Sequence, residues 1–113
     1  MKKLAVFLVL LGLGAFPALA AAATFNDVPV VDVKCSTQVA ANPDAHTRTC
    51  ALACEKSGYG IFTNDQKFLK FDAAGNKEIV EELKASHEKD RLRVNVSGAV
   101  QGDTLKVSSI KLL

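Results

Sequence analysis

The sequence has little that would mark a nucleic-acid-binding protein or a thiol-redox enzyme. Its 113 residues carry a formal net charge of only +2, and Lys2 and Lys3 account for that excess. A nucleic-acid partner would require a basic face, which the balanced remainder of the chain does not supply. The three cysteines include no Cys-x-x-Cys pair, so the common thiol-redox motif is missing. Internal repeats are also absent, and the length of the chain after a signal peptide of about 20 residues fits one small domain.

The first 20 residues have the pattern of a bacterial signal peptide. Lys2 and Lys3 precede an apolar run over residues 4–16, shorter than the about 20 residues that a membrane span needs. Small residues follow, and cleavage is expected between residues 20 and 23. No cysteine follows the cleavage region, so the usual lipoprotein anchor is missing. We predict a protein exported to the periplasm or secreted, with no membrane attachment after cleavage.

The rest of the chain is predicted to form a single domain over residues 25–113. In chain order, we expect one Val-rich strand, then two strands that form a central hairpin, and then two strands that form a final hairpin. In the first strand Val31, Val33 and Cys35 would share one face. The first four strands are predicted at residues 25–35, 61–63, 67–71 and 92–101, and the fifth follows the Gly102-Asp103 turn and includes residues 105–112.

The final hairpin has the clearest strand pattern. The residues expected to face the core alternate with residues expected to face outward, and they are Leu92, Val94, Val96 and Val100. In the last strand the parity of the apolar residues changes at Ser108-Ser109. A β-bulge is therefore predicted there.

Two helices are predicted between these strands. The first is expected over residues 43–57, because Asn42-Pro43 is a typical helix start and Gly58 a typical helix end. The second, over residues 76–87, carries apolar and charged residues on opposite sides and is amphipathic.

This order of elements predicts the fold class. Five short strands with a helix between the third and the fourth are the order of an OB-fold, a small barrel. The expected fold is thus mainly β with two helices: a five-stranded OB-fold-like barrel with a cysteine-bearing helix inserted after the first strand.

The chain from about residue 31 onward resembles a group of small exported bacterial OB-fold proteins. The resemblance lies in a strand-end cysteine followed by His-x3-Cys-x3-Cys, in the segment GIFTNDQKFLKF, and in the final hairpin RVNVSGAVQGDTLKVSSIKL. It implies an exported OB-fold domain and does not imply an activity.

The first hypothesis for function is a metal site formed by Cys35, His46, Cys50 and Cys54. The last three are each four residues apart, so one helix would present them on the same face. Thiolates and an imidazole suit tetrahedral zinc, and thiolates also select cuprous copper. We therefore predict an exported, non-enzymatic protein that binds zinc or copper.

The alternative hypothesis is a disulfide-stapled interaction or ligand-binding module without metal, since exported proteins meet an oxidising compartment. Residues four apart on a helix have Cβ atoms about 5–6 Å apart, too far for a disulfide. Cys35 would then pair with Cys50 or Cys54. In that case His46 has no special partner, so His46→Ala should leave stability almost unchanged.

An enzyme is not expected. A cysteine nucleophile would need an oriented base and an oxyanion site, and only His46 and Cys50 offer such a pair by spacing. No catalytic residues are predicted. The expected partners are a metal ion or an unknown protein or small ligand, and no nucleic acid.

Overall fold

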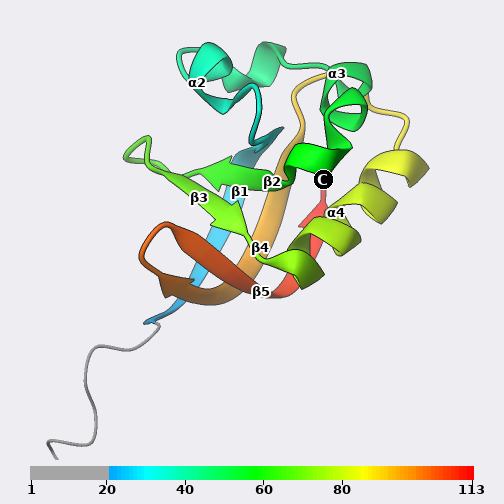
Figure 1. Ribbon diagram of the computed structural model, residues 1–113. Coiled ribbons are helices and arrows are strands. Elements are labelled where there is room, and N and C mark those ends of the chain that lie inside the picture. Colours follow the sequence, from blue (N-terminus) through cyan, green and yellow to red (C-terminus); the bar gives the residue numbers. More distant parts are fainter. Residues whose placement is uncertain (1–20) are drawn as a thin grey trace, which may run out of the picture.

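The structure is a computed structural model that describes residues 21–113, and the chain forms a closed five-stranded β-barrel (Figure 1). The strands follow the order β1-β2-β3-β5-β4 around the barrel, antiparallel throughout except for the parallel pair β3 and β5. Their bounds are Ala21–Asp32 (β1), Tyr59–Phe62 (β2), Phe68–Phe71 (β3), Arg93–Gln101 (β4) and Thr104–Leu112 (β5). The predicted five-stranded, mainly β architecture is confirmed, while the predicted signal peptide lies outside the described residues.

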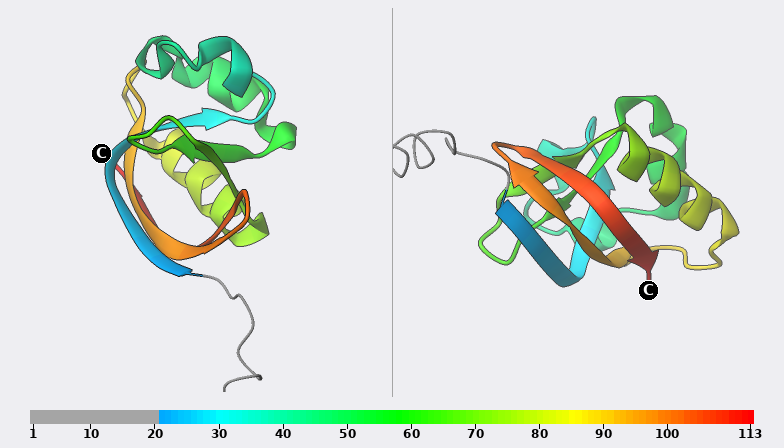
Figure 2. Two further views of the ribbon diagram at one scale, coloured as in Figure 1. Left: turned by 90° about the vertical axis from the view of Figure 1, so that its left-hand side faces the viewer. Right: turned by 90° about the horizontal axis from the view of Figure 1, so that it is seen from below.

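Strand β1 pairs with β4 along its first part and with β2 at its end, where it bends across the barrel (Figure 2). An irregularity in the pairing lies between Phe25 and Val28. Val28 and Val30 belong to the barrel core. The strand ends at Asp32, three residues earlier than predicted, so Cys35 lies in the connection that follows it.

Helix α4 (Ala73–Ala85) covers the side of the barrel formed by β3 and β5 (Figure 1). It begins three residues before the predicted start because Asp72 acts as its N-cap and accepts a 3.1 Å hydrogen bond from the Gly75 amide. Ile79 and Leu83 are fully buried and pack into the barrel core. The predicted amphipathic helix is therefore present.

The final hairpin follows the predicted pattern. Val94 and Val96 are buried, with 0% and 1% of their surface exposed. The pairing passes from Ser97–Ser109 to Gly98–Val107, which leaves Ser108 as the extra residue of a bulge. Gly98 is needed at this point, because a Cβ there would lie 2.1 Å from the Lys106 carbonyl oxygen. The predicted bulge is confirmed.

The connection between β1 and β2 differs from the single helix predicted over residues 43–57. It consists of four short helical elements that lie over one end of the barrel (Figure 1). The bounds are Ser36–Val39 (α2), Pro43–Ala45 (η1), Arg48–Ala53 (α3) and Glu55–Ser57 (η2). Only Cys50 of the three cysteines lies inside a helix, at the start of α3. The predicted common helical face of His46, Cys50 and Cys54 is therefore wrong.

The interruption has a local cause. The Thr47 side chain accepts a 3.1 Å hydrogen bond from the Cys50 amide and is the N-cap of α3, so a new helix begins after it. Asn42 makes no such side-chain bond, and only a short 3₁₀ turn follows Pro43. His46 stands between the two elements with extended backbone angles, φ −72° and ψ 130°.

One hydrophobic core fills the barrel and extends to α3 and α4. It consists of Val28, Val30, Ala51, Tyr59, Ile61, Leu69, Phe71, Ile79, Leu83, Leu92, Val94, Val96 and Leu105. Within residues 21–113, every buried side-chain nitrogen or oxygen has a hydrogen-bond partner. No helix among the described residues is long and apolar enough to cross a membrane.

Candidate metal centre

A buried carboxylate and a buried imidazole meet where β1 ends. Asp32 is fully buried and His46 is 8% exposed, and they are the only buried polar or charged residues of the described chain. The Nε2 atom of His46 lies 2.6 Å from Oδ1 of Asp32, a short hydrogen bond or ion pair. A buried carboxylate is costly unless such a partner compensates it, so each residue requires the other.

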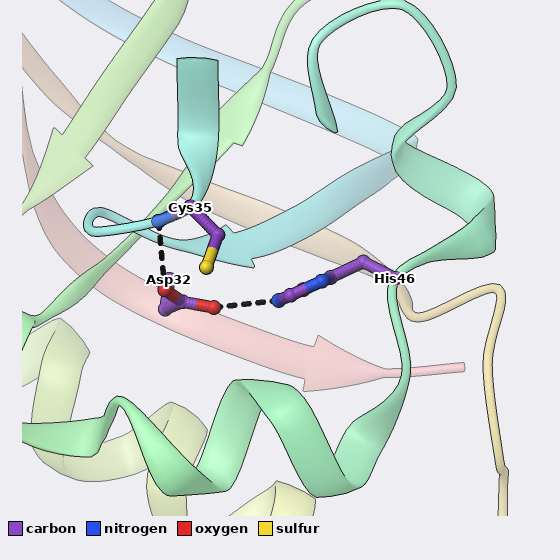
Figure 3. A group of neighbouring side chains, drawn as sticks. All are labelled: Asp32, Cys35 and His46. Atoms are coloured by element: carbon purple, nitrogen blue, oxygen red, sulfur yellow. Dashed lines mark hydrogen bonds and ion pairs between the residues drawn. The ribbon is translucent and has the colours of Figure 1, made fainter. Parts of the chain in front are cut away.

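Cys35 completes a group of three potential metal ligands at this position. Its amide donates a 3.0 Å hydrogen bond to Oδ2 of Asp32, which folds the chain back after the strand. One ligand atom each from Asp32, Cys35 and His46 lies within 4.8 Å of the other two. Figure 3 shows the Cys35 sulfur and the His46 ring directed toward the Asp32 carboxylate. We call these residues the Asp32–Cys35–His46 cluster.

Asp44 fixes the position of η1, directly before His46. Its carboxylate receives 3.0 and 2.9 Å hydrogen bonds from Nε and Nη2 of Arg93, at the start of β4. Hydrogen bonding to this guanidinium lowers the pKa of Asp44 below its ordinary value. The Asp44 carbonyl also accepts a 2.8 Å bond from the Arg91 amide. The turn that presents His46 is thereby tied to the barrel.

Cys54 lies beside the cluster, 4.3 Å from Cys35. The antiparallel pairing of β1 and β2 ends at Asp32–Tyr59, and a 2.8 Å bond from the Val33 amide to the Gly58 carbonyl continues it. Gly58 has a positive φ of 82°, which suits glycine, and it turns the chain from η2 into β2. The chain segments that carry the two cysteines are thus held together by the barrel itself.

Cys50 lies apart from this arrangement. It is exposed at the beginning of α3 and is not a member of the Asp32–Cys35–His46 cluster. Of the four predicted ligands, the structure thus brings Cys35 and His46 together, places Cys54 next to Cys35, and leaves Cys50 outside. All three cysteines are thiols, and residues 21–113 contain no disulfide.

The electrostatics of the cluster keep Cys35 protonated in the absence of a metal. Burial raises the pKa of the Cys35 thiol, and the neighbouring Asp32 carboxylate and Cys54 thiol raise it further. A cation placed among these groups would reverse the effect, because it stabilises the thiolate form. The surroundings of Cys35 therefore disfavour a free thiolate and would favour a bound cation.

Asp32 is the residue that the sequence argument missed. It shares the strand parity of Val28 and Val30, which face the core, and this parity is visible in the sequence. The prediction placed Val31, Val33 and Cys35 on one face, extended the strand to Cys35 and assigned Asp32 no role. The available signal was an Asp at a strand position whose side chain faces the core, shortly before a turn that contains a cysteine.

Comparisons with known proteins give no further guide to the site, since no protein-family model, curated protein or solved structure matches the chain.

Proposed function

We propose that the protein binds a transition-metal ion, zinc in the first place, through Asp32, Cys35 and His46. The observation that carries this proposal is the convergence of a carboxylate oxygen, a thiol sulfur and an imidazole nitrogen within 4.8 Å of one another. Cys54, 4.3 Å from Cys35, offers a fourth donor for a tetrahedral shell. This ligand set retains three of the predicted residues and replaces Cys50 with Asp32.

The distances in the cluster are compatible with a small local movement on binding. Two nitrogen or oxygen ligands of a tetrahedral zinc ion, each about 2.0–2.1 Å from the metal, are about 3.3 Å apart. Asp32 Oδ1 and His46 Nε2 are 2.6 Å apart, so the ion would replace the hydrogen between them and separate them slightly. His46 belongs to the η1–α3 connection, so this movement leaves the barrel strands in place.

The mixture of donors favours zinc over copper. A carboxylate oxygen and an imidazole nitrogen are ordinary zinc ligands, whereas cuprous copper selects sulfur. Cuprous copper is the second candidate, because Cys35 and Cys54 together supply two thiolates.

The proposed role is binding and not catalysis. A catalytic cysteine acts as a thiolate, usually with a lowered pKa. Burial raises the pKa of Cys35, which opposes such a role. The cluster therefore suits a structural or carrier metal better than a nucleophile.

We also propose that the domain is an exported member of the OB-fold class. The strand order β1-β2-β3-β5-β4 and the position of α4 between β3 and β4 support the fold. Export rests on the signal-peptide pattern of residues 1–20, with the periplasm or the medium as destination. N-terminal sequencing of the mature protein should find a first residue between Ala21 and Thr24, and an intact Met1 would contradict export.

The metal proposal is tested by titrating the reduced protein with Zn²⁺ in competition with a chromophoric chelator. One equivalent is expected to bind to the wild type. Cys35→Ser removes a ligand and should weaken binding more than about 10-fold. Loss of a residue that only hydrogen-bonds to a metal ligand already costs about 10- to 100-fold in affinity. Cys50→Ser is the matched control, because it makes the same chemical change outside the cluster, and its affinity should equal that of the wild type.

Two results would contradict the proposal. One is a reduced wild-type protein that binds no Zn²⁺ and no cuprous copper. The other is an equal loss of affinity in Cys35→Ser and Cys50→Ser, which would assign binding to a different set of ligands.

A further inference from the structure

We propose that Cys35 and Cys54 form a reversible disulfide and that this disulfide and the metal exclude each other. The inference rests on the proposed metal site and adds its regulation: the reduced protein binds the ion, and the oxidised protein releases it. The two hypotheses drawn from the sequence, a metal site and a disulfide, then become two states of one site.

The first support is the proximity of the two thiols. Cys35 and Cys54 lie 4.3 Å apart in the reduced protein, and formation of an S–S bond of about 2.05 Å requires only a further approach of the side chains. Cys35 is the N-cap residue of α2, and Cys54 is the C-cap residue of α3. Both stand at ends of short elements outside the barrel strands, where the backbone can adjust.

The second support is the pairing that holds these two segments together. Beyond the last β1–β2 pair, the Val33 amide bonds to the Gly58 carbonyl at 2.8 Å and the Lys34 amide bonds to the Ser57 hydroxyl oxygen at 3.1 Å. The Ser57 hydroxyl in turn donates a 2.9 Å bond to the Cys54 carbonyl. These bonds bring Cys54 toward the turn that contains Cys35. A disulfide would therefore add a covalent link to two segments that hydrogen bonds already hold together.

Cys50 is not the partner in this pair. It is exposed at the start of α3, whereas Cys54 follows the end of the same helix. Cys50 is also outside the Asp32–Cys35–His46 cluster, whereas Cys54 lies 4.3 Å from Cys35. Oxidation should therefore leave Cys50 as a thiol.

The proposed oxidant is a low-molecular-weight disulfide, which reacts with the protein by thiol–disulfide exchange. One cysteine thiolate attacks a sulfur of the oxidant, forms a mixed disulfide with the protein and displaces one thiol. The second cysteine, as thiolate, then displaces the remaining half as a second thiol. Two protein thiols become one disulfide, the oxidant is reduced to two thiols, and the two protons pass from the protein thiols to the released thiolates.

Oxidation removes donors from the site. Thiolates are the form that binds a metal, and the disulfide would consume Cys35 of the Asp32–Cys35–His46 cluster together with Cys54. Of the proposed metal ligands, only Asp32 and His46, 2.6 Å apart, would then remain. Conversely, a bound ion occupies the thiolates and should slow their oxidation.

The test equilibrates the protein with reduced or oxidised glutathione, removes the glutathione, and titrates each form with Zn²⁺. The oxidised protein should be lighter by the mass of two hydrogens, with peptide mapping locating the bond at Cys35–Cys54. Its Zn²⁺ affinity should fall by more than about 100-fold, because loss of a ligand should cost more than loss of a residue that only hydrogen-bonds to a ligand. Zinc-loaded protein should oxidise more slowly than metal-free protein.

Two variants complete the test. Cys50→Ser should behave like the wild type in both states. The double variant Cys50→Ser/Cys54→Ser cannot form an internal disulfide, so its intact mass should show no two-hydrogen loss; circular dichroism checks that it is folded. If the reduced wild type binds no metal, the proposed function fails and this inference fails with it. If the reduced form binds Zn²⁺ but the oxidised form binds equally well, or if the bond involves Cys50, only the inference is overturned.

Discussion

The His46 Nε2 atom and the Asp32 Oδ1 atom lie 2.6 Å apart, with both side chains buried. This contact gives His46 a structural role in the metal-free protein. The sequence argument expected His46→Ala to be almost neutral in a protein without metal, because it assigned His46 no other partner. The assumption that His46 has no partner is wrong. We therefore expect a loss of stability under either hypothesis, so stability alone cannot separate the two.

We predict that His46→Ala destabilises the metal-free, reduced protein. The change leaves the fully buried Asp32 carboxylate with only the Cys35 amide as a hydrogen-bond donor. Breaking a buried pair of this kind costs about 3 kcal/mol or more in the free energy of unfolding. Urea denaturation in the presence of a chelator and a reductant measures the loss.

His87→Ala is the matched control, because His87 is exposed, and it should change stability by less than about 0.5 kcal/mol. Equal stability of the two variants would contradict the prediction.

The Asp44–Arg93 ion pair predicts a specific pH dependence. The Arg93 guanidinium lowers the folded-state pKa of Asp44 below its ordinary 3.8. The stabilisation is therefore present above about pH 4, the ordinary range of an Asp carboxyl, and is lost as the pH falls through the lower, folded-state value. Asp44→Asn should cost about 1 kcal/mol at pH 7, since the pair is partly exposed, and nothing once Asp44 is protonated in both states.

Urea midpoints of wild type and Asp44→Asn at a series of pH values check this prediction. Asp103→Asn is the comparison, because Asp103 is exposed in the turn between β4 and β5, at the opposite end of β4 from Arg93. A difference between wild type and Asp44→Asn that persists unchanged at the lowest pH would rule out the ion pair as its cause.

Tyr59 offers a spectroscopic reporter near the site. It is the only tyrosine, and the chain has no tryptophan. Its hydroxyl donates a 2.7 Å hydrogen bond to the Ala51 carbonyl, and burial raises its pKa to about 12, with Glu55, Asp32 and Cys54 adding to the shift. Its neutral form stabilises the fold fully below about pH 10, and this contribution is lost as the pH rises through the folded-state pKa.

Alkaline titration of the tyrosinate absorbance should give a midpoint near pH 12 while circular dichroism shows the protein folded. Tyr59→Phe removes the signal and identifies it. The same substitution should destabilise the fold by about 1 kcal/mol or more, because the Ala51 carbonyl loses its donor. A midpoint near that of free tyrosine in the folded protein would mean that Tyr59 is not buried.

The final hairpin shows what local sequence can predict about this fold. The alternation through Val94 and Val96 predicted the buried face, and the change of parity predicted the bulge at Ser108. These features are predictable because each strand residue has only two possible sides. The parallel contact of β3 with β5 depends on closure of the whole barrel, which no local pattern encodes.

The candidate site was only partly predictable, for two physical reasons. The four-residue spacing of His46, Cys50 and Cys54 predicted one helical face, but the Thr47 cap begins a new helix and leaves His46 in extended backbone. Asp32 is brought to His46 by a tertiary contact across 14 positions of sequence. A carboxylate at the end of a strand becomes a candidate ligand only once that contact is known.

The most direct test of the central claim, that Asp32, Cys35 and His46 hold a metal, is X-ray absorption spectroscopy at the zinc edge of the zinc-loaded, reduced protein. We expect a mixed shell, with sulfur at about 2.3 Å and nitrogen or oxygen at about 2.0–2.2 Å, including the multiple scattering of one imidazole. Cys35→Ser should lose sulfur scattering, and Cys50→Ser should give the wild-type spectrum. A shell of oxygen alone, or a spectrum that changes in Cys50→Ser and not in Cys35→Ser, would contradict the proposed site.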